Sequence, residues 1–287
     1  MNHTEQRKRL RALMAGSKCL SPASIFDPIS ARVAEGVGYE IGLLAGSVAS
    51  HSTLAAPDLI VLTLSEMADQ VRRIMRVSNL SLIVDADHGY GNALNVMRTT
   101  QELEHAGVSA FSIEDTALPT PFGQDEDKPS LISIAEGVGK MRAAVAARQD
   151  PSLIIAGRTS ALMIEGVEGT IARLKAYAAA GVDAIFLSGL KTLAEVEAVH
   201  AAVKLPIIAG NAPASLKRDD LAAQGVRVLF QGHHSIPAAV KALRETYTHL
   251  FNGGAPADLG PKIASAKEMA GLISEDDYKK WQGEYLR

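Results

Sequence analysis

The chain has 287 residues, of which 47% are hydrophobic and 21% charged, so a large core is possible and disorder is excluded on composition. Its formal net charge of −3 argues against nucleic acid as the main partner, because phosphate binding needs clustered Lys and Arg. Cys19 is the single cysteine, which excludes an internal disulfide. The basic N-terminus and the lack of a long apolar run predict a cytoplasmic protein that does not enter a membrane.

Short apolar runs alternate with longer amphipathic stretches. Eight runs have the composition of strands that are buried on both faces, at residues 18–20, 41–45, 81–84, 110–113, 153–156, 184–187, 206–209 and 226–230. The stretches between them have helical periodicity, as in 171–181 and 192–203. Eight alternations favour a (β/α)8 TIM-type barrel, with an open doubly wound sheet as the alternative. Since no long linker interrupts it, we expect residues 1–287 to form one domain.

Two segments lie outside this repeat. Residues 1–16 are expected to form a leading helix, and residues 262–287 two trailing helices. Ser274 and Asp277 have the spacing of a capping box at the start of the last helix. The aromatic residues of that helix share one face, namely Tyr278, Trp281 and Tyr285. This face packs either on its own barrel or on a neighbouring subunit.

Acidic residues follow the strands at the end of the barrel where active sites lie. Asp85 and Asp87 follow the third run at alternate positions, so both face one side of an extended chain. Glu114 follows the fourth run, and Asp58 lies in the loop after the second. Converging carboxylates need protons or a cation, and hard oxygen donors favour Mg²⁺, with Mn²⁺ as an alternative. Taken singly, Asp58 could instead be a helix cap or a loop charge.

Other polar residues end the remaining strands. Arg158 is expected at the barrel mouth, where it binds either a substrate carboxylate or the acid cluster itself. Ser47 follows a glycine turn, and its amide and hydroxyl could stabilise an oxyanion. Asn211 and His233 end the seventh and eighth runs, and we assign both to substrate binding.

Two other chemistries agree less well with the sequence. A zinc site would have to combine His88 with His233, yet these follow different strands and neither belongs to an HxH or HxxxH pair. A Schiff base would need a lysine at the carboxyl end of a strand, and Lys191 is the one candidate.

The combination of motifs resembles the phosphoenolpyruvate mutase/isocitrate lyase superfamily. The motifs are DADHGYG at 85–91, IED at 113–115, GRTS at 157–160, the GS turn at 46–47, FDPISARVAEGVGYE at 26–40 and AAPD at 55–58. The resemblance extends over essentially the whole chain. It implies Mg²⁺ bound directly by Asp85, with Asp58, Asp87 and Glu114 mainly acting through water.

The resemblance also implies roles for other residues. The 2-oxo-carboxylate of the substrate would chelate the metal, Ser47 would receive the oxyanion, and Arg158 would grip a carboxylate. A C-terminal helix would be exchanged between the subunits of a homodimer or homotetramer.

Departures from the family pattern select a branch. The lyases carry a cysteine general acid in the loop after strand 4, but residues 118–133 here contain none. The Asn-rich loop of the mutases is missing, Ser188 stands where the lyases have Glu, and His233 stands where many relatives have Tyr. These features resemble the oxaloacetate decarboxylase branch.

The branch implies a lyase that decarboxylates oxaloacetate to pyruvate and CO2 through a metal-stabilised enolate. His233 would orient the departing carboxylate or help to protonate the enolate. Three alternatives stay open: a C–C lyase acting on a methylisocitrate- or dimethylmalate-like 2-hydroxy acid, a phosphonomutase-type relative, and a non-catalytic 2-oxo acid binder.

Overall fold

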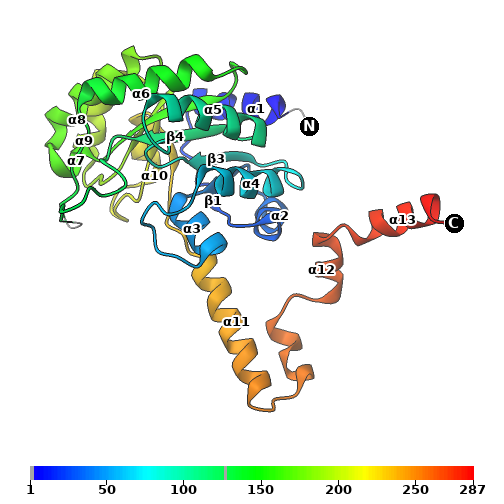
Figure 1. Ribbon diagram of the computed structural model, residues 1–287. Coiled ribbons are helices and arrows are strands. Elements are labelled where there is room, and N and C mark those ends of the chain that lie inside the picture. Colours follow the sequence, from blue (N-terminus) through cyan, green and yellow to red (C-terminus); the bar gives the residue numbers. More distant parts are fainter. Residues whose placement is uncertain (1–2, 126–127) are drawn as a thin grey trace.

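The computed structural model describes residues 3–125 and 128–287. Eight parallel strands follow one another in chain order, and helices cover their outer side, which is the predicted (β/α)8 TIM-type architecture (Figure 1). The strands are β1 (Ala23–Ser24), β2 (Ile41–Leu44), β3 (Ser81–Asp85), β4 (Ala110–Glu114), β5 (Ile154–Thr159), β6 (Ala184–Leu187), β7 (Ile207–Ala209) and β8 (Val226–Leu229).

The helices fill the connections between strands and both ends of the chain. They are α1 (Thr4–Ala15), α2 (Pro28–Val37), α3 (Gly46–Leu54), α4 (Leu64–Met75), α5 (Ala93–Ala106), α6 (Ile134–Ala147), α7 (Ala161–Ile164), α8 (Gly166–Ala179), α9 (Leu193–Val203), α10 (Arg218–Ala223), α11 (Ser235–Phe251), the 3-10 helix η1 (Pro256–Lys262), α12 (Ala266–Leu272) and α13 (Glu275–Tyr285). The predicted helices at 171–181 and 192–203 correspond to α8 and α9. Several begin with a side-chain cap, as Thr192 does for α9.

The prediction for the first strand is wrong in position. The strand β1 comprises Ala23 and Ser24, which pair with β2, rather than residues 18–20. Leu20 still closes the barrel, because its backbone forms a parallel bridge to Val228 on β8. Pro22 lies between the two pairing segments and has no N–H to donate, so one continuous strand cannot form there.

The other seven predicted strands are confirmed with small shifts at their ends. Strand β3 includes Asp85 and β4 includes Glu114, so these acids end the strands instead of following them. Strand β5 continues to Thr159, and in its register Arg158 lies beside Glu114 on one neighbour and Phe186 on the other. The strand pairing thus places an acid, a base and an aromatic ring side by side at one end of the barrel.

The barrel interior is a packed hydrophobic core, and α1 closes it at the amino ends of the strands. Leu10 and Met14 of α1 join the buried residues of the strands in one cluster. Arg7 donates from Nε to the Val108 carbonyl at 2.9 Å, and Arg11 donates from Nε to the Ser152 carbonyl at 2.9 Å. Both carbonyls precede strands, so α1 covers the amino ends. The carboxyl ends form the opposite, open face.

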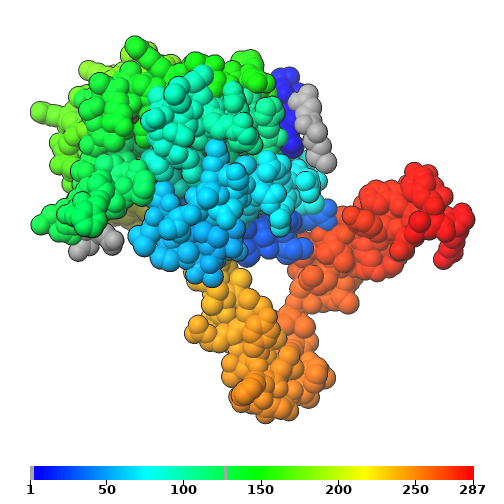
Figure 2. Space-filling model, in the orientation of Figure 1, coloured from blue at the N-terminus to red at the C-terminus, as the bar shows by residue number. Residues whose placement is uncertain are grey.

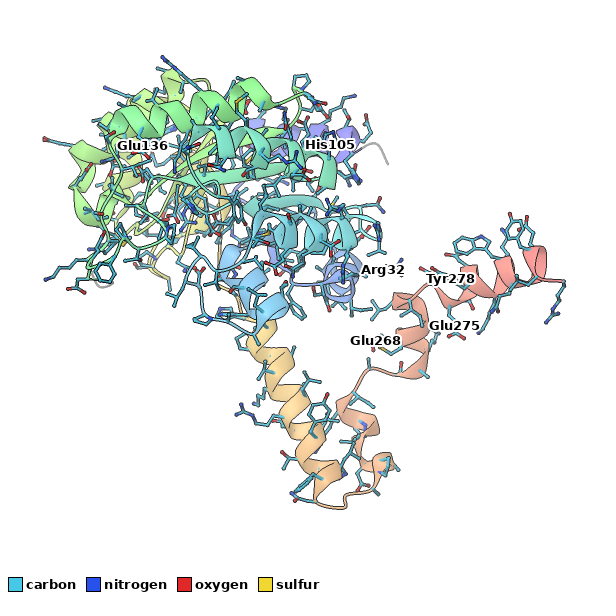
Figure 3. The ribbon with its side chains drawn as sticks, in the orientation of Figure 1. Arg32, His105, Glu136, Glu268, Glu275 and Tyr278 are labelled. Carbon is cyan, nitrogen blue, oxygen red and sulfur yellow. The ribbon has the colours of Figure 1, made fainter. Side chains whose placement is uncertain are left out.

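The C-terminal segment forms an arm that extends from the barrel. Helix α11 leads away from the body, and the chain then turns back through η1 to α12 and α13 (Figures 1 and 2). Arg32 of α2 holds the arm by donating from Nη1 to the Leu272 carbonyl and, at 2.8 Å, to Ser274 Oγ (Figure 3). No helix in the described part of the chain is long and apolar enough to cross a bilayer.

The trailing helices form as predicted, but the capping box does not. Ser274 has a φ of 54° and makes no side-chain cap, because a capping residue normally has an extended backbone; its hydroxyl accepts a bond from Arg32. The aromatic face of α13 does not pack on its own barrel, since Tyr278 and Tyr285 are 61% and 70% exposed. Of the two predicted partners for this face, only a neighbouring subunit is still possible.

Candidate active site

A cavity of about 370 Å³ lies at the carboxyl ends of the strands. Its lining comprises Ala45, Ser47, Asp58, Asp85, Arg158, Phe186, Ser188, Gly189, Gly210, Asn211, Phe230 and His233. Six of the eight predicted site residues are in this lining. The other two, Asp87 and Glu114, are buried behind it, at 7% and 6% exposure. The structure therefore brings the predicted residues together at one mouth, while their chemical roles stay predictions.

Asp85 and Glu114 are linked through one guanidinium. Arg158 donates from Nη1 to Asp85 Oδ2, and its Nη2 lies 3.4 Å from Glu114 Oε2. A hydroxyl steadies each acid: Ser112 Oγ donates to Asp85 Oδ1 at 3.2 Å, and Thr116 Oγ1 donates to Glu114 Oε2 at 2.9 Å. The ends of β3, β4 and β5 are thus joined by hydrogen bonds.

Asp87 lies between β3 and β4 with a left-handed backbone conformation. Its φ of 47° is in the left-handed region, which Asp tolerates better than most non-glycine residues. The Glu114 amide donates to its carbonyl at 2.8 Å. Its carboxylate lies against Gly46, where an added Cβ would be only 2.3 Å from Asp87 Oδ1. Glycine at position 46 therefore lets the start of α3 approach the acids closely.

Mutual repulsion and burial perturb the acids. Burial raises the pKa of Asp87 well above its ordinary value, and the nearby Asp85, Asp58 and Glu114 raise it further. Burial also raises the pKa values of Glu114 and Asp58, while Arg158 lowers both. Such a cluster takes up either protons or a further cation to relieve the repulsion among its carboxylates.

Arg158 contacts the acid cluster, which is one of the two partners that the sequence predicts for it. Its side chain is 19% exposed and lines the cavity, so it can also meet a substrate carboxylate. The guanidinium carbon lies 5.1 Å from the centre of the Phe186 ring, within the range of a cation–π contact. Phe186 in turn packs edge-to-face on Phe230, with centroids 5.1 Å apart.

His233 faces the cavity from the start of the segment that leads to α11. Its Nδ1 lies 2.9 Å from Ser24 Oγ of β1, which fixes the ring plane. Burial lowers the pKa of His233, although Asp85 and Asp58 act in the opposite direction. Since Ser24 occupies Nδ1, Nε2 is the ring nitrogen available to a substrate.

Ser47 is the second residue of α3, directly after Gly46. Backbone N–H groups in the first turn have no partner within a helix, and the helix dipole favours negative charge at that end. The position therefore suits an oxyanion, as the sequence predicts. Asn211 reaches the cavity from the end of β7 with a φ of 42°.

The residues of the rival chemistries lie elsewhere. His88 is buried outside the cavity lining, and burial lowers its pKa to about 4, with Lys140 contributing. Lys191 is exposed in the loop before α9 and also lies outside the lining. The structure thus does not bring together the residues that zinc or a Schiff base would need.

The donor set fits a hard divalent cation, because Asp58 and Asp85 line the cavity and the carboxyl groups of Asp87 and Glu114 are buried behind it. Within residues 3–125 and 128–287, no group of three or more His, Cys, Asp or Glu side chains is already spaced as ligands of one metal ion. Arg158 lies between Asp85 and Glu114, so coordination by both acids requires side-chain rotation.

Sequence reasoning missed several residues that support the site. These are Ser24, Ser112, Thr116, Lys140, Phe186 and Phe230. Phe186 could have been found, because a large ring near the end of a strand that faces the barrel interior must border the mouth. The hydroxyls could not, since Ser and Thr at strand ends are common and their partners come from other strands.

Comparisons with known proteins identify relatives of this chain. The family model described as phosphoenolpyruvate phosphomutase matches residues 10–251. A protein of Rhodopseudomonas palustris (strain BisB18) named oxaloacetate decarboxylase is 52% identical over 270 residues, which cover 94% of this chain and 93% of that protein.

Two solved structures have the same fold over nearly the full length. The phosphoenolpyruvate phosphomutase of Streptomyces platensis subsp. rosaceus superposes with a TM-score of 0.88 at 26% identity and covers 99% of both chains. A phosphonopyruvate hydrolase in complex with oxalate and Mg²⁺ superposes with a TM-score of 0.85 at 30% identity and covers 100% of both.

Proposed function

This chain belongs to the phosphoenolpyruvate phosphomutase family, and from that premise we propose that it is a divalent-cation-dependent oxaloacetate decarboxylase. The observation that carries the proposal is the arrangement of Asp85, Asp58 and Arg158 in one cavity with His233. The relative of Rhodopseudomonas palustris supports the substrate, because it bears the name oxaloacetate decarboxylase and matches nearly the whole chain.

We assign the cation to the acid cluster. Asp85 would bind it directly, and Asp58, Asp87 and Glu114 would act mainly through water. Mg²⁺ is the proposed ion, with Mn²⁺ as its substitute, since both favour carboxylate and water oxygens. When bound, the cation would supply Lewis-acid polarisation of the 2-oxo group.

The chain's own residues supply the rest of the reaction. Breaking the C3–C4 bond releases CO2, and the electron pair moves to C3 and the 2-oxo oxygen. Ser47 at the start of α3 stabilises the negative charge on that oxygen. Arg158 holds a substrate carboxylate, and His233 orients the carboxylate that leaves or delivers the proton that C3 takes up to give pyruvate.

The loop after β4 favours decarboxylation over C–C cleavage of a 2-hydroxy acid. That cleavage needs a general acid, and residues 118–133 contain no cysteine to provide one; of these, 126–127 lie outside the described residues. Cys19 cannot replace it, because it is buried beside Leu20 at the closed, amino end of the barrel.

The experiment compares pyruvate formation with Mg²⁺, with EDTA and with protein-free Mg²⁺, because oxaloacetate also decarboxylates in solution. We expect EDTA to abolish the protein-dependent rate, and Mg²⁺ to restore it. A panel of 2-oxo and 2-hydroxy dicarboxylates is assayed by NMR in parallel. Turnover that survives chelation, or release of succinate from a methylisocitrate-like acid without oxaloacetate turnover, would refute the proposal.

We further propose a homodimer or homotetramer in which the arm, with residues 262–287, packs on a neighbouring subunit. Helix α11 has no buried residue, and its apolar side chains are exposed, with Val240 and Leu243 each at 49% and Tyr247 at 64%. A groove of about 1090 Å³ separates α11 from α3 and α4. Exposed apolar surface of this kind marks a protein contact.

Light scattering of the purified protein tests the assembly. We expect the mass of two or four chains, and dissociation in Leu243→Asp. A monomer that retains full activity would contradict the exchange of helices.

A further inference from the structure

Lys140 of α6 is a buried cation that the proposed reaction does not use. Its side chain is 4% exposed, and Nζ donates to the His88 carbonyl at 2.9 Å. Burying an ammonium is costly unless acceptors or opposite charges compensate. Glu136, Glu114 and Asp115 provide such charge, because they oppose the lowering of the Lys140 pKa by burial. The ammonium therefore lies against the loop that follows β3, next to Asp87 in the chain.

The segment that Lys140 holds is the loop after β3, which presents Asp87. Four of its residues have positive φ, namely Asp87 (47°), Gly89 (83°), Tyr90 (61°) and Gly91 (143°). For Asp87 and Tyr90 this conformation is unfavourable, and it persists only where surrounding contacts impose it.

Three consecutive carbonyls of this loop are held by three different elements. The Glu114 amide of β4 donates to Asp87 O at 2.8 Å, and Thr99 of α5 donates from Oγ1 to Gly89 O at 3.0 Å. Lys140 of α6 holds the carbonyl between them, that of His88. Its bond is the one made by a charged donor, and such bonds are roughly twice as strong as neutral ones.

We propose that Lys140 is a positioning residue for the proposed cation site, which it serves by fixing the His88 carbonyl and thereby the Asp87 carboxylate. The inference rests on the proposed function, since it assumes that Asp87 helps to hold the cation. Asp87 has little freedom on its other side, where Gly46 meets its carboxylate. A rotation of the loop would therefore displace the Asp87 carboxylate from its place beside Gly46.

The test is direct binding of Mn²⁺ to the full-length protein, measured by electron paramagnetic resonance. Lys140→Met keeps a long, unbranched side chain and removes the ammonium that donates to the His88 carbonyl. We expect its Kd for Mn²⁺ to rise about 10-fold or more, the usual effect of removing a group that orients a metal ligand. Unchanged affinity in Lys140→Met would overturn the inference.

Arg7→Met is the matched control. Arg7 is 5% exposed and also donates to backbone carbonyls, those of Val108 and Glu104, but at the closed end of the barrel. We expect this variant to lower the Tm and leave the Kd for Mn²⁺ unchanged. An equal rise in Kd in both variants would mean that loss of stability alone explains the effect, which would also overturn the inference.

Three further outcomes of the Mn²⁺ titrations can be distinguished. If Lys140→Met does not fold, the milder Lys140→Gln takes its place. We expect its Kd to rise about 3-fold or more, because a shorter, neutral donor replaces the ammonium. Wild-type affinity in the folded Gln variant overturns the inference. If the wild-type protein binds no Mn²⁺, the proposed cation site fails together with the inference. If the wild type binds and the variants bind equally well, the inference alone fails.

Discussion

Replacing Arg158 by Met tests whether this guanidinium is the built-in counter-charge of the acid cluster. The change keeps the length of the side chain and removes its contacts with Asp85, with Glu114 at 3.4 Å and with the face of Phe186. Removing one partner of a buried ion pair costs about 3–5 kcal/mol. Because 19% of the Arg158 side chain is exposed, we take the lower end, ~3 kcal/mol. That loss corresponds to a fall in Tm of ~6–12 °C.

The loss of Tm in Arg158→Met is expected to depend on pH. Arg158 lowers the pKa values of Asp87, Glu114 and Asp58, so its loss raises all three. A carboxyl group whose pKa is raised in the folded state stabilises the fold when protonated, and that contribution is lost as pH rises through the folded pKa. The Tm of Arg158→Met should therefore approach that of the wild type at pH 5 and diverge from it at pH 8.

Circular dichroism melts of both proteins at pH 5 and pH 8, in EDTA, measure the effect. Arg148→Met serves as the control, because Arg148 pairs with Asp183 at 2.6 Å with 16% of its side chain exposed, outside the acid cluster. Its deficit should stay nearly constant between the two pH values. A deficit of Arg158→Met that is the same at both pH values, or absent, would show that the acids do not depend on this cation.

Three further predictions concern neighbouring contacts. Gly46→Ala places a methyl group 2.3 Å from Asp87 Oδ1 and should weaken Mg²⁺ binding about 10-fold or more in calorimetric titration; wild-type affinity would contradict the assigned role of Asp87. His233→Gln should lower kcat for oxaloacetate about 100-fold. Ser24→Ala, which removes the bond to Nδ1 of His233, should lower kcat about fivefold. Full activity of His233→Gln would exclude a role of His233 in the reaction. Tyr177→Phe removes the 2.7 Å bond to buried Asp115 and should cost about 1–3 kcal/mol in urea unfolding, and an unchanged midpoint would contradict that.

The sequence was sufficient for the barrel because each strand is a separate apolar run and the helices between them are amphipathic. It failed at β1, where only two residues pair with β2 and the proline between them and Leu20 divides the wall into two short contacts. No local hydrophobic pattern exists in two residues. The capping box failed for a different reason: Ser274 has a left-handed backbone, and its hydroxyl accepts a bond from Arg32, 242 positions earlier in the chain.

Within the candidate site, the strand ends were predictable and the connections between them were not. Asp85, Glu114 and Arg158 could be assigned to one mouth because parallel strands all end on the same side. The pairing of Arg158 with Phe186 depends on the register between β5 and β6, which no single run encodes. Lys140 is harder still, because a lysine on an amphipathic helix is normally exposed, and its burial follows from the loop that packs over α6.

Because α1 and the packed interior close the amino end of the barrel, the cavity opens at the carboxyl ends of the strands. Because Leu10 and Met14 seal the amino end, whatever reacts at the carboxyl end must enter and depart by the same route. In a decarboxylase the remaining keto acid would then have to clear this passage before the next dicarboxylate could arrive. Pyruvate should accordingly compete with oxaloacetate. At high product concentration, the rate at which pyruvate leaves the cavity should limit turnover.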